Sequence, residues 1–457
     1  MRALTRRCFF VLAALVAIQA SAPLAQAPRT KPGSNHVVII SLDGFPASAL
    51  DDPRLPLPNL RRLAARGAVA KGMRPVNPSV TWPNHTSMVT GVTPAKHGVL
   101  FNGVLVREPG VPPRIEPWRD RKEMVRVPTL YDVAHQRGLT TAQVDWVAIQ
   151  NAPTITWEFR ERPEPKGIAQ ELVKAGTLSQ EDVATFASGN ILWRDYVWTA
   201  AGAHIIRTHR PNLLLFHLLN LDSTHHRYGP RAPAALNTMA YLDTQVGALL
   251  DALRDAGIAA RTTVFVVADH GFKLVKRQIR PNAAFMKAGL LKAEQGKVSR
   301  AQAWSVPEGG SAMVYVTVPD PSGQILATVR QALDGVEGID QVIEPKDYAQ
   351  YGLPLPSVNQ QMGALFLTAK DGYAFTAAVG DDTVVDAPAG SLGSHGYIGT
   401  DPEMLALFIA YGRGIRPGVK LDIIDNVDLA PTAARLLGIE LKDADGQPLK
   451  DILAAGR

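Results

Sequence analysis

Continuous apolar runs recur along the chain and alternate with amphipathic segments. Three of the runs, "HVVIISL", "NLLLFHLLNL" and "TTVFVVA", are rich in leucine or β-branched residues. Runs of this length are typical of strands buried on both faces, as in a parallel sheet covered by helices. A fourth run, "MLALFIAYG" from residue 404, predicts another buried strand. The pattern therefore predicts a central sheet between two layers.

Helical segments lie between these runs. The clearest span residues 58–67, 127–138 and 232–257, and each is closed by a glycine. A capped closing helix is expected in "NVDLAPTAARLLGI" near the end of the chain. Alternation of strands and helices predicts a doubly wound α/β fold, with a mostly parallel central sheet and helices on both faces.

The alternation of strands and helices is interrupted between about residues 273 and 390. This stretch contains "GGSAMVYVTVPD", "GQILATVRQALDGVEGIDQVI" and "GYAFTAAVGDD", a mixture of strands and one helix. We expect a small α+β subdomain inserted into a main domain that spans residues 28–457.

Residues 1–27 have the features of a secretory signal peptide: three arginines, an apolar run and an Ala-Gln-Ala end. We expect cleavage and a periplasmic or secreted protein, with an uncleaved anchor as the alternative. No later stretch approaches the roughly 20 apolar residues of a membrane span, so no stable span is expected after cleavage. The only cysteine, Cys8, lies in this leader, and the mature chain would therefore contain no disulfide.

The charge balance is weakly basic. The formal net charge is +6, and three of the positive charges lie in the leader. The remainder is too small and too scattered to indicate a nucleic-acid scaffold.

Polar residues follow the apolar runs where the predicted strands end. Asp43 follows the first run, Asp222 the second, and Asp269 with His270 the third. Functional residues of open α/β sheets gather in the crevice at the carboxyl ends of the strands. We therefore expect these side chains to lie at one edge of the sheet.

Their spacing is compatible with metal binding. If the chain becomes helical after the second strand, Asp222 and His226 share one face. Asp269 and His270 could face a second ion, and His395 lies between glycines that permit close approach. Taken singly, a strand-end aspartate more often caps a helix and a lone histidine more often lies in a surface turn. Their common location favours a metal site.

The stretch "NPSVTWPNHTSMVTG" holds two hydroxyl residues, Ser79 and Thr81, before a short helical run. Either hydroxyl can cap the helix, or one can be a nucleophile held near exposed backbone N–H groups. The stretch alone leaves both interpretations open.

Six ordered motifs resemble those of the nucleotide pyrophosphatase/phosphodiesterase family of the alkaline phosphatase superfamily. The resemblance covers about residues 36–440 and is weakest over 105–200 and 273–390. The motifs are "LDGF" with Asp43, "TWPNHTSMVTG" with Thr81, "HGVLFN" with Asn102, "DSTHHRYGP" with Asp222 and His226, "ADHGF" with Asp269 and His270, and "SHGY" with His395.

The resemblance implies an alkaline phosphatase-like fold and two zinc ions. One ion would be held by Asp43, Asp269 and His270 and would also contact Thr81; the other would be held by Asp222, His226 and His395. Thr81 would be the nucleophile, through a phospho-threonine intermediate, with Ser79 structural. Asn102 would donate its amide to a phosphoryl oxygen.

Several neighbouring residues have structural interpretations. His85 and His97 are expected to fix loops. Trp82 could stack on a substrate, whereas core packing is favoured for Trp146. Lys273 is expected to be solvated.

The sequence thus predicts a secreted dizinc phosphodiesterase or nucleotide pyrophosphatase acting on a small phosphodiester, nucleotide-like or a lipid headgroup. A phosphomonoesterase or phosphonate hydrolase of the same superfamily is the alternative. A third is an inactive binding protein on this fold. A sulfatase is disfavoured because the nucleophile motif of that class is absent, and "FHLLNL" offers no acidic ligand for a third metal.

Overall fold

The computed structural model describes residues 35–294 and 296–455. The predicted signal peptide, with Cys8, lies outside the described residues. Among the helices of the described ranges, none combines the length and hydropathy needed to cross a bilayer.

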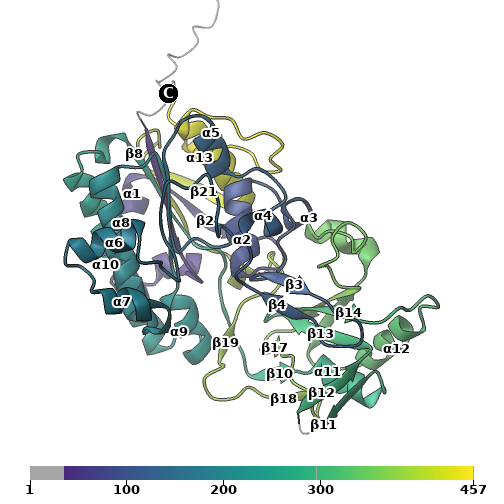
Figure 1. Cartoon of the computed structure of the whole chain (residues 1–457). Coiled ribbons are helices and arrows are strands. Elements are labelled where there is room, and N and C mark those ends of the chain that lie inside the picture. Colours follow the sequence, from purple (N-terminus) through teal and green to yellow (C-terminus); the bar gives the residue numbers. More distant parts are fainter. Residues whose placement is uncertain (1–34, 295, 456–457) are drawn as a thin grey trace, which may run out of the picture.

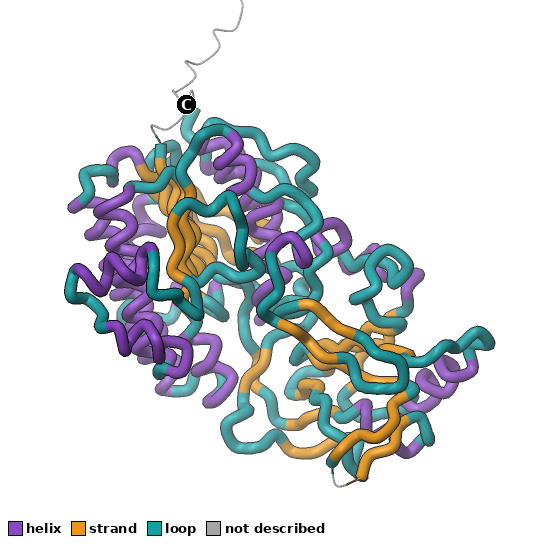
Figure 2. The backbone as a smooth tube through the Cα atoms, viewed as in Figure 1, coloured by secondary structure: helices purple, strands orange, loops and turns teal. Residues whose placement is uncertain are grey.

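The core of the molecule is an eight-stranded sheet (Figure 2). β1 pairs in parallel with β7 and β8, β5 with β6 and β7, and β2 with β21, whereas β20 is antiparallel to both of its neighbours. The mostly parallel sheet is thus confirmed. In order across the sheet, the strands are β21 (Val419–Asp425), β2 (Ala68–Arg74), β20 (Phe408–Gly412), β8 (Thr262–Val267), β1 (His36–Leu42), β7 (Leu213–Leu218), β5 (Thr141–Val144) and β6 (Trp157–Phe159).

Helices cover both faces of this sheet (Figure 1). One layer contains α1 (Pro58–Arg66), α6 (Gly167–Lys174), α8 (Ile191–His209) and α10 (Pro233–Asp255). The other contains α2 (Thr81–Thr90), α5 (Leu130–Gln136) and α13 (Leu429–Leu437). This arrangement confirms the doubly wound α/β architecture, because each central strand is buried from both sides.

The predicted helices form where their caps and apolar positions allow. Thr129 accepts a hydrogen bond from the Asp132 N–H, while the Asp132 side chain accepts from the Thr129 N–H, which closes a capping box at the start of α5. α8 had no counterpart among the segments singled out in the sequence. Its 19 residues bury apolar side chains on most sides, so the helix has no clear polar face to signal it.

Smaller sheets and a second apolar cluster occupy the region after β8. Leu100, Phe101 and Leu105 also belong to this second cluster, so the earlier chain packs against the later region. The inserted subdomain at about 273–390 stays a prediction. The strands here are β10 (Arg277–Ile279), β17 (Tyr373–Phe375) and β18 (Val384–Asp386); β11 (Leu291–Glu294) and β12 (Lys297–Ala301); and β13 (Ala303–Pro307), β14 (Ser311–Val316), β15 (Ile339–Ile343) and β16 (Leu365–Ala369).

A two-stranded antiparallel pairing joins the two ends of this region. β9 (Lys273–Leu274) pairs with β19 (Gly393–Ser394), which returns the chain to the edge of the central sheet. The short elements that complete the description are β3 (Val104–Val106), β4 (Arg114–Glu116), α3 (Pro94–His97), α4 (Arg121–Met124), α7 (Gln180–Thr185), α9 (Asn220–Tyr228), α11 (Pro281–Lys287) and α12 (Gln324–Leu333).

Candidate metal centre

Two buried carboxylates stand at the ends of neighbouring parallel strands. Asp43 directly follows β1, Asp269 follows β8, and both are fully buried. The backbone N–H of Gly44 donates a hydrogen bond of 3.1 Å to Asp269 Oδ1, so the two strand ends are linked. The strand-end positions therefore place both acids at the carboxyl edge of the sheet.

Asp222 and His226 lie on α9, which follows β7. Their side chains share one face of this helix, with His226 Nε2 3.4 Å from Asp222 Oδ1. The helix start is fixed from α8, where the buried Asp195 carboxylate accepts hydrogen bonds from the N–H groups of Leu219 and Asn220 at 3.0 and 3.2 Å. The helical spacing expected from the sequence is thus present.

His395 reaches the same edge from the end of β19. Its Nε2 lies 3.6 Å from Asp222 Oδ1, and its ring stacks on that of His270 at a centroid distance of 3.8 Å. Its Nδ1 is hydrogen-bonded to the Ser79 carbonyl at 3.1 Å. Gly396 follows with φ +84°, and a Cβ there would lie 1.6 Å from the Glu308 carbonyl oxygen. Only glycine permits this approach.

The cluster contains buried polar atoms that lack hydrogen-bond partners among the described residues. They are Asp43 Oδ1, Asp222 Oδ1, Asp269 Oδ2 and His270 Nε2. His270 Nε2 is 3.1 Å from the Asp269 oxygen and 3.5 Å from the Asp43 oxygen. Leaving such atoms unsatisfied is costly, whereas a cation among them would coordinate them together.

The donor atoms form two overlapping sets. Asp222, His226 and His395 form one set, and Asp43, Asp222 and His270 form the other; within each, the donor atoms lie within 4.8 Å of one another. Asp222 therefore belongs to both sets. Asp269 belongs to neither, but its Oδ2 lies 3.1 Å from the Nε2 of His270 in the second set. The six residues singled out by the sequence are brought together, and their carboxylate and imidazole donors are of the type that zinc prefers.

The electrostatics of the cluster favour a bound cation. Burial, followed by the charges of Asp269 and Asp222, raises the pKa of Asp43 well above its usual value. Burial also acts to raise the pKa of Asp222, but His226, together with His395 and His270, outweighs burial and holds that pKa below the ordinary value. Three carboxylates crowded in a buried space repel one another, and a divalent cation would relieve that repulsion.

The two hydroxyl residues near the cluster have different environments. Thr81 is the first residue of α2, the N-cap is Val80, and no side chain of that cap residue bonds to the helix. Ser79 Oγ donates a 2.5 Å hydrogen bond to the Tyr397 carbonyl. The Thr81 hydroxyl therefore does not act as the helix cap, and the Ser79 hydroxyl is engaged in holding the chain that follows His395.

Asn102 meets the start of the same helix. Its Oδ1 accepts a 2.9 Å hydrogen bond from the backbone N–H of Trp82, one of the N–H groups that a helix leaves unpaired at its start. This contact fixes the carboxamide beside Thr81, while its Nδ2 amide is a donor that the contact does not use.

A cavity of about 150 Å³, with three tryptophans and several polar residues in its lining, lies beside Trp82. Trp82 is 7 % exposed and packs on an apolar cluster that includes Val99 and Met124, so it is both a packing residue and a cavity wall. Trp146 is buried in the main core, as expected from the sequence, and also lines this cavity. The other walls include Trp118, Asp145 and Arg162.

Two further buried histidines, His217 and His85, lie beside the carboxylates of Asp43 and Asp269, and His217 was not singled out in the sequence. His217 Nε2 is 3.1 Å from Asp43 Oδ2, and its Nδ1 is 3.2 Å from an Asp145 carboxylate oxygen. Burial lowers the pKa of His217, but the hydrogen bonds to these two acids outweigh it and raise that pKa well above 6.5. A lone histidine inside the apolar run "NLLLFHLLNL" was the available signal. His85 is likewise buried, with Nδ1 2.9 Å from the Thr81 carbonyl.

The other two residues given structural interpretations behave differently. His97 Nε2 is 3.0 Å from Ser87 Oγ and its Nδ1 accepts from the Val99 N–H, so it fixes the loop as predicted. The expectation that Lys273 is solvated is wrong. Its side chain is 5 % exposed and its ammonium contacts Asp371 and, at 2.6 Å, Asp401. The two acids that converge on this position draw the side chain inward.

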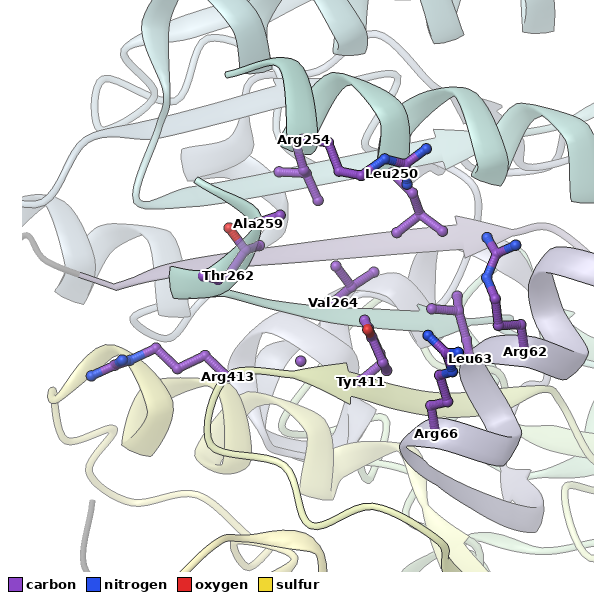
Figure 3. Close-up of a pocket in the computed structure, with 13 residues that line it drawn as sticks. Arg62, Leu63, Arg66, Leu250, Arg254, Ala259, Thr262, Val264, Tyr411 and Arg413 are labelled. Carbon is purple, nitrogen blue, oxygen red and sulfur yellow. The ribbon is translucent and has the colours of Figure 1, made fainter. Parts of the chain in front are cut away.

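A separate groove of about 490 Å³ lies away from this cluster, where β8 begins (Figure 3). Its floor includes Leu250, Val264 and Tyr411. Thr262 opens β8 at the groove, whereas Asp269 follows the other end of the same strand. The groove contains none of the residues predicted for the site. Four arginines surround it: Arg62, Arg66, Arg254 and Arg413.

The chain is similar to curated proteins over most of its length. It is 23 % identical over 433 residues to mouse ectonucleotide pyrophosphatase/phosphodiesterase family member 1, which covers 89 % of this chain and 41 % of that protein. It is 23 % identical to the human family member 7, over 93 % of this chain and 85 % of that protein. Venom phosphodiesterase 2 of Crotalus adamanteus is 21 % identical over 88 % of this chain. The chain thus spans about two fifths of the length of the member 1 relatives.

Solved structures share the fold. Human ectonucleotide pyrophosphatase/phosphodiesterase 5 superposes with a TM-score of 0.70 at 19 % identity, covering 92 % of this chain and 100 % of that one. The murine protein, solved as an inactive threonine-to-alanine variant in complex with AMP, gives a TM-score of 0.69. The alkaline phosphatase-like fold expected from the sequence is confirmed. The family model for type I phosphodiesterase / nucleotide pyrophosphatase matches residues 37–398, and the chain belongs to this family.

Proposed function

We propose that this chain is a dizinc phosphodiesterase or nucleotide pyrophosphatase that acts through a phospho-threonine intermediate on Thr81. The observation that carries the proposal is the convergence of six ligand-type side chains, with four unsatisfied buried donor atoms, at the strand edge beside Thr81. The six side chains come from distant parts of the sequence, yet their donor atoms lie close together, as the ligands of a pair of ions must. Asp43, Asp269 and His270 would hold one ion, and Asp222, His226 and His395 the other.

The chain's own residues have defined roles in this proposal. The ions, when bound, would supply positive charge that stabilises the attacking and leaving oxygens of an in-line displacement at phosphorus. The Thr81 hydroxyl oxygen, at the start of α2, attacks phosphorus as the P–O bond to the leaving alcohol or phosphate breaks, and Thr81 carries the substituted phosphoryl group until water displaces it. Asn102 donates its Nδ2 amide to a non-bridging oxygen, because its Oδ1 is already fixed by the Trp82 N–H.

The cavity beside Trp82 suits the organic substituent of a small phosphodiester. Its walls include the aromatic rings of Trp82, Trp118 and Trp146, which can stack on a planar group or enclose an apolar one. AMP in the complex of the murine relative supports a nucleotide-like substituent here. A lipid headgroup is the other chemistry that this cavity would accommodate. Relatives that carry the name ectonucleotide or venom enzyme support an exported location.

The surroundings of the proposed nucleophile favour a diester over a monoester. A monoester dianion carries an extra charge that enzymes commonly meet with an arginine or another cation. Arg107, the arginine nearest to Asn102 in sequence, instead donates to the Val316 carbonyl at 2.8 Å and lies over the Tyr315 ring. His217 is also committed, because both of its nitrogens face carboxylates.

The test is a comparison of substrates on the purified protein with zinc at pH near 8. We expect a higher kcat/KM for bis-p-nitrophenyl phosphate, or for the p-nitrophenyl ester of thymidine monophosphate, than for p-nitrophenyl phosphate. A preference for the monoester would instead identify a phosphomonoesterase on the same centre. An absence of turnover on all three, with both ions bound, would favour a binding protein.

A further inference from the structure

A second group of metal-ligand side chains lies between α6 and α8. Glu171, His204 and His209, here called the helix cluster, each offer one donor atom, and these atoms lie within 4.8 Å of one another. Both imidazoles point the same nitrogen at the same carboxylate oxygen: His204 Nε2 and His209 Nε2 are each 2.8 Å from Glu171 Oε2. The three side chains therefore converge on one point.

The helix cluster is separate from the centre at the strand edge. α8 carries Asp195, which fixes the start of α9, near one end and His209 at the other. Fourteen residues of helix at about 1.5 Å each put roughly 20 Å between these positions. Among the described residues, the cluster shares no member with either donor set of the centre.

We propose that the helix cluster is a mononuclear zinc site. Two imidazole nitrogens and one glutamate oxygen are a three-ligand protein set that zinc accepts, with water in the fourth position. The side chains are 22 %, 18 % and 33 % exposed for His204, His209 and Glu171, so one side of the cluster is open to solvent for that water.

The geometry needs only a small adjustment. Tetrahedral zinc with bonds of about 2.0–2.1 Å separates its ligand atoms by roughly 3.3 Å, whereas the nitrogen–oxygen distances here are 2.8 Å. An outward shift of about 0.5 Å converts two hydrogen bonds into two coordinate bonds. Each imidazole would bind as its Nδ1–H tautomer: its Nε2–H bond breaks, that proton passes to solvent, and the Nε2 lone pair is free to coordinate.

The surroundings hold one of the three ligands in place. The Trp157 ring stacks on that of His209 at 4.6 Å with an interplanar angle of 24°, which restricts the orientation of the imidazole. Glu171 lies on α6 and both histidines lie on α8, so a bound ion would tie the two helices together.

The test is zinc content by equilibrium dialysis of the full chain at micromolar free zinc, measured by elemental analysis. We expect the wild type to hold one zinc ion per chain more than Glu171→Gln and than His204→Gln. His135→Gln, at an exposed histidine on α5, is the matched control and should hold as much zinc as the wild type. Two variants are used so that failure of one to fold leaves the other.

Two further measurements distinguish this site from the proposed active centre. The kcat/KM of Glu171→Gln should stay within about twofold of the wild type, since the substitution lies far from Thr81. Added zinc should raise the Tm of the zinc-depleted wild type more than that of Glu171→Gln, because only the wild type has the extra ligand set. Equal zinc content in the wild type and both variants would overturn the proposal, whatever the diesterase assay shows.

Discussion

The candidate metal centre and the helix cluster contain the same kinds of ligand-type side chain in opposite environments. The centre is buried, and several of its donor atoms have no partner among the residues described. The helix cluster is partly open to solvent, and its donors already bond to one another. An ion at the centre would therefore relieve unsatisfied groups, whereas an ion at the helix cluster would have to displace hydrogen bonds that exist without it.

This difference bears on what each site can do. Buried and preorganised donors make ion binding part of the folded state, and they leave little room for water other than the reacting one. Donors on helices near the surface would instead bind an ion to a structure that is already folded and hydrogen-bonded without it. We therefore expect activity to depend on the centre, and only metal content and stability to depend on the helix cluster.

The largest effect is expected from removing the proposed nucleophile. Thr81→Ala should lower kcat by roughly 1,000-fold or more, because the neighbouring hydroxyl, that of Ser79, is already bonded to the Tyr397 carbonyl. Both ions should remain, since all six ligand side chains are still present. Turnover of a p-nitrophenyl diester and elemental analysis check this. Ser79→Ala is the matched control and should retain most of the activity; the opposite result would make Ser79 the nucleophile.

The tandem histidines of α9 give the next largest difference. His226→Ala should lose one zinc ion and reduce kcat/KM by at least about 100-fold, because it removes a direct ligand. His225 is buried against Phe272 and contributes to neither donor set, so His225→Ala should keep both ions. Zinc content of the two variants decides between them. Loss of an ion only from His225→Ala would contradict the assignment.

A smaller effect is expected at His217, which contacts Asp43 without belonging to a donor set. His217→Asn should weaken zinc binding by roughly 10- to 100-fold, because it no longer orients the Asp43 carboxylate. Zinc titration of metal-depleted protein measures this. Activity should recover at high zinc, which a folding defect would not allow. An unchanged zinc affinity would remove His217 from any positioning role.

The smallest effect is expected at Lys273. Lys273→Met should lower the free energy of unfolding by about 1–2 kcal/mol, because the buried stem is replaced while Asp401 and Asp371 lose their partner at a site still reached by solvent. Denaturant unfolding measures the change. Lys276→Met, at the exposed lysine nearby, is the control and should change stability little. Equal losses in both variants would show that the ion pairs contribute nothing.

The features that could be predicted from the sequence are those for which one residue pattern allows one geometry. Buried runs gave the strands, the four-residue spacing placed His226 over Asp222, and the strand-end acids fell at one edge as the topology requires. It did not indicate that β20 runs antiparallel, because an apolar run reads the same in both directions. It also missed the contact between His217 and Asp145, since that contact depends on strand register and on a loop that carries no motif.

The pairing of β9 with β19 brings His395 to the candidate metal centre, so the centre is complete only after this part of the chain has folded. His395 contacts Ser79 across 316 positions of sequence, and the whole second apolar cluster must form between them or be held out of the way. Closing so long a loop is entropically costly and slow, so this contact is expected to form late in folding. Until then one donor set has only two of its three members. Full occupancy of the centre by metal would therefore require that the segment carrying His395 has docked. The rate of zinc uptake would then measure the last step of folding.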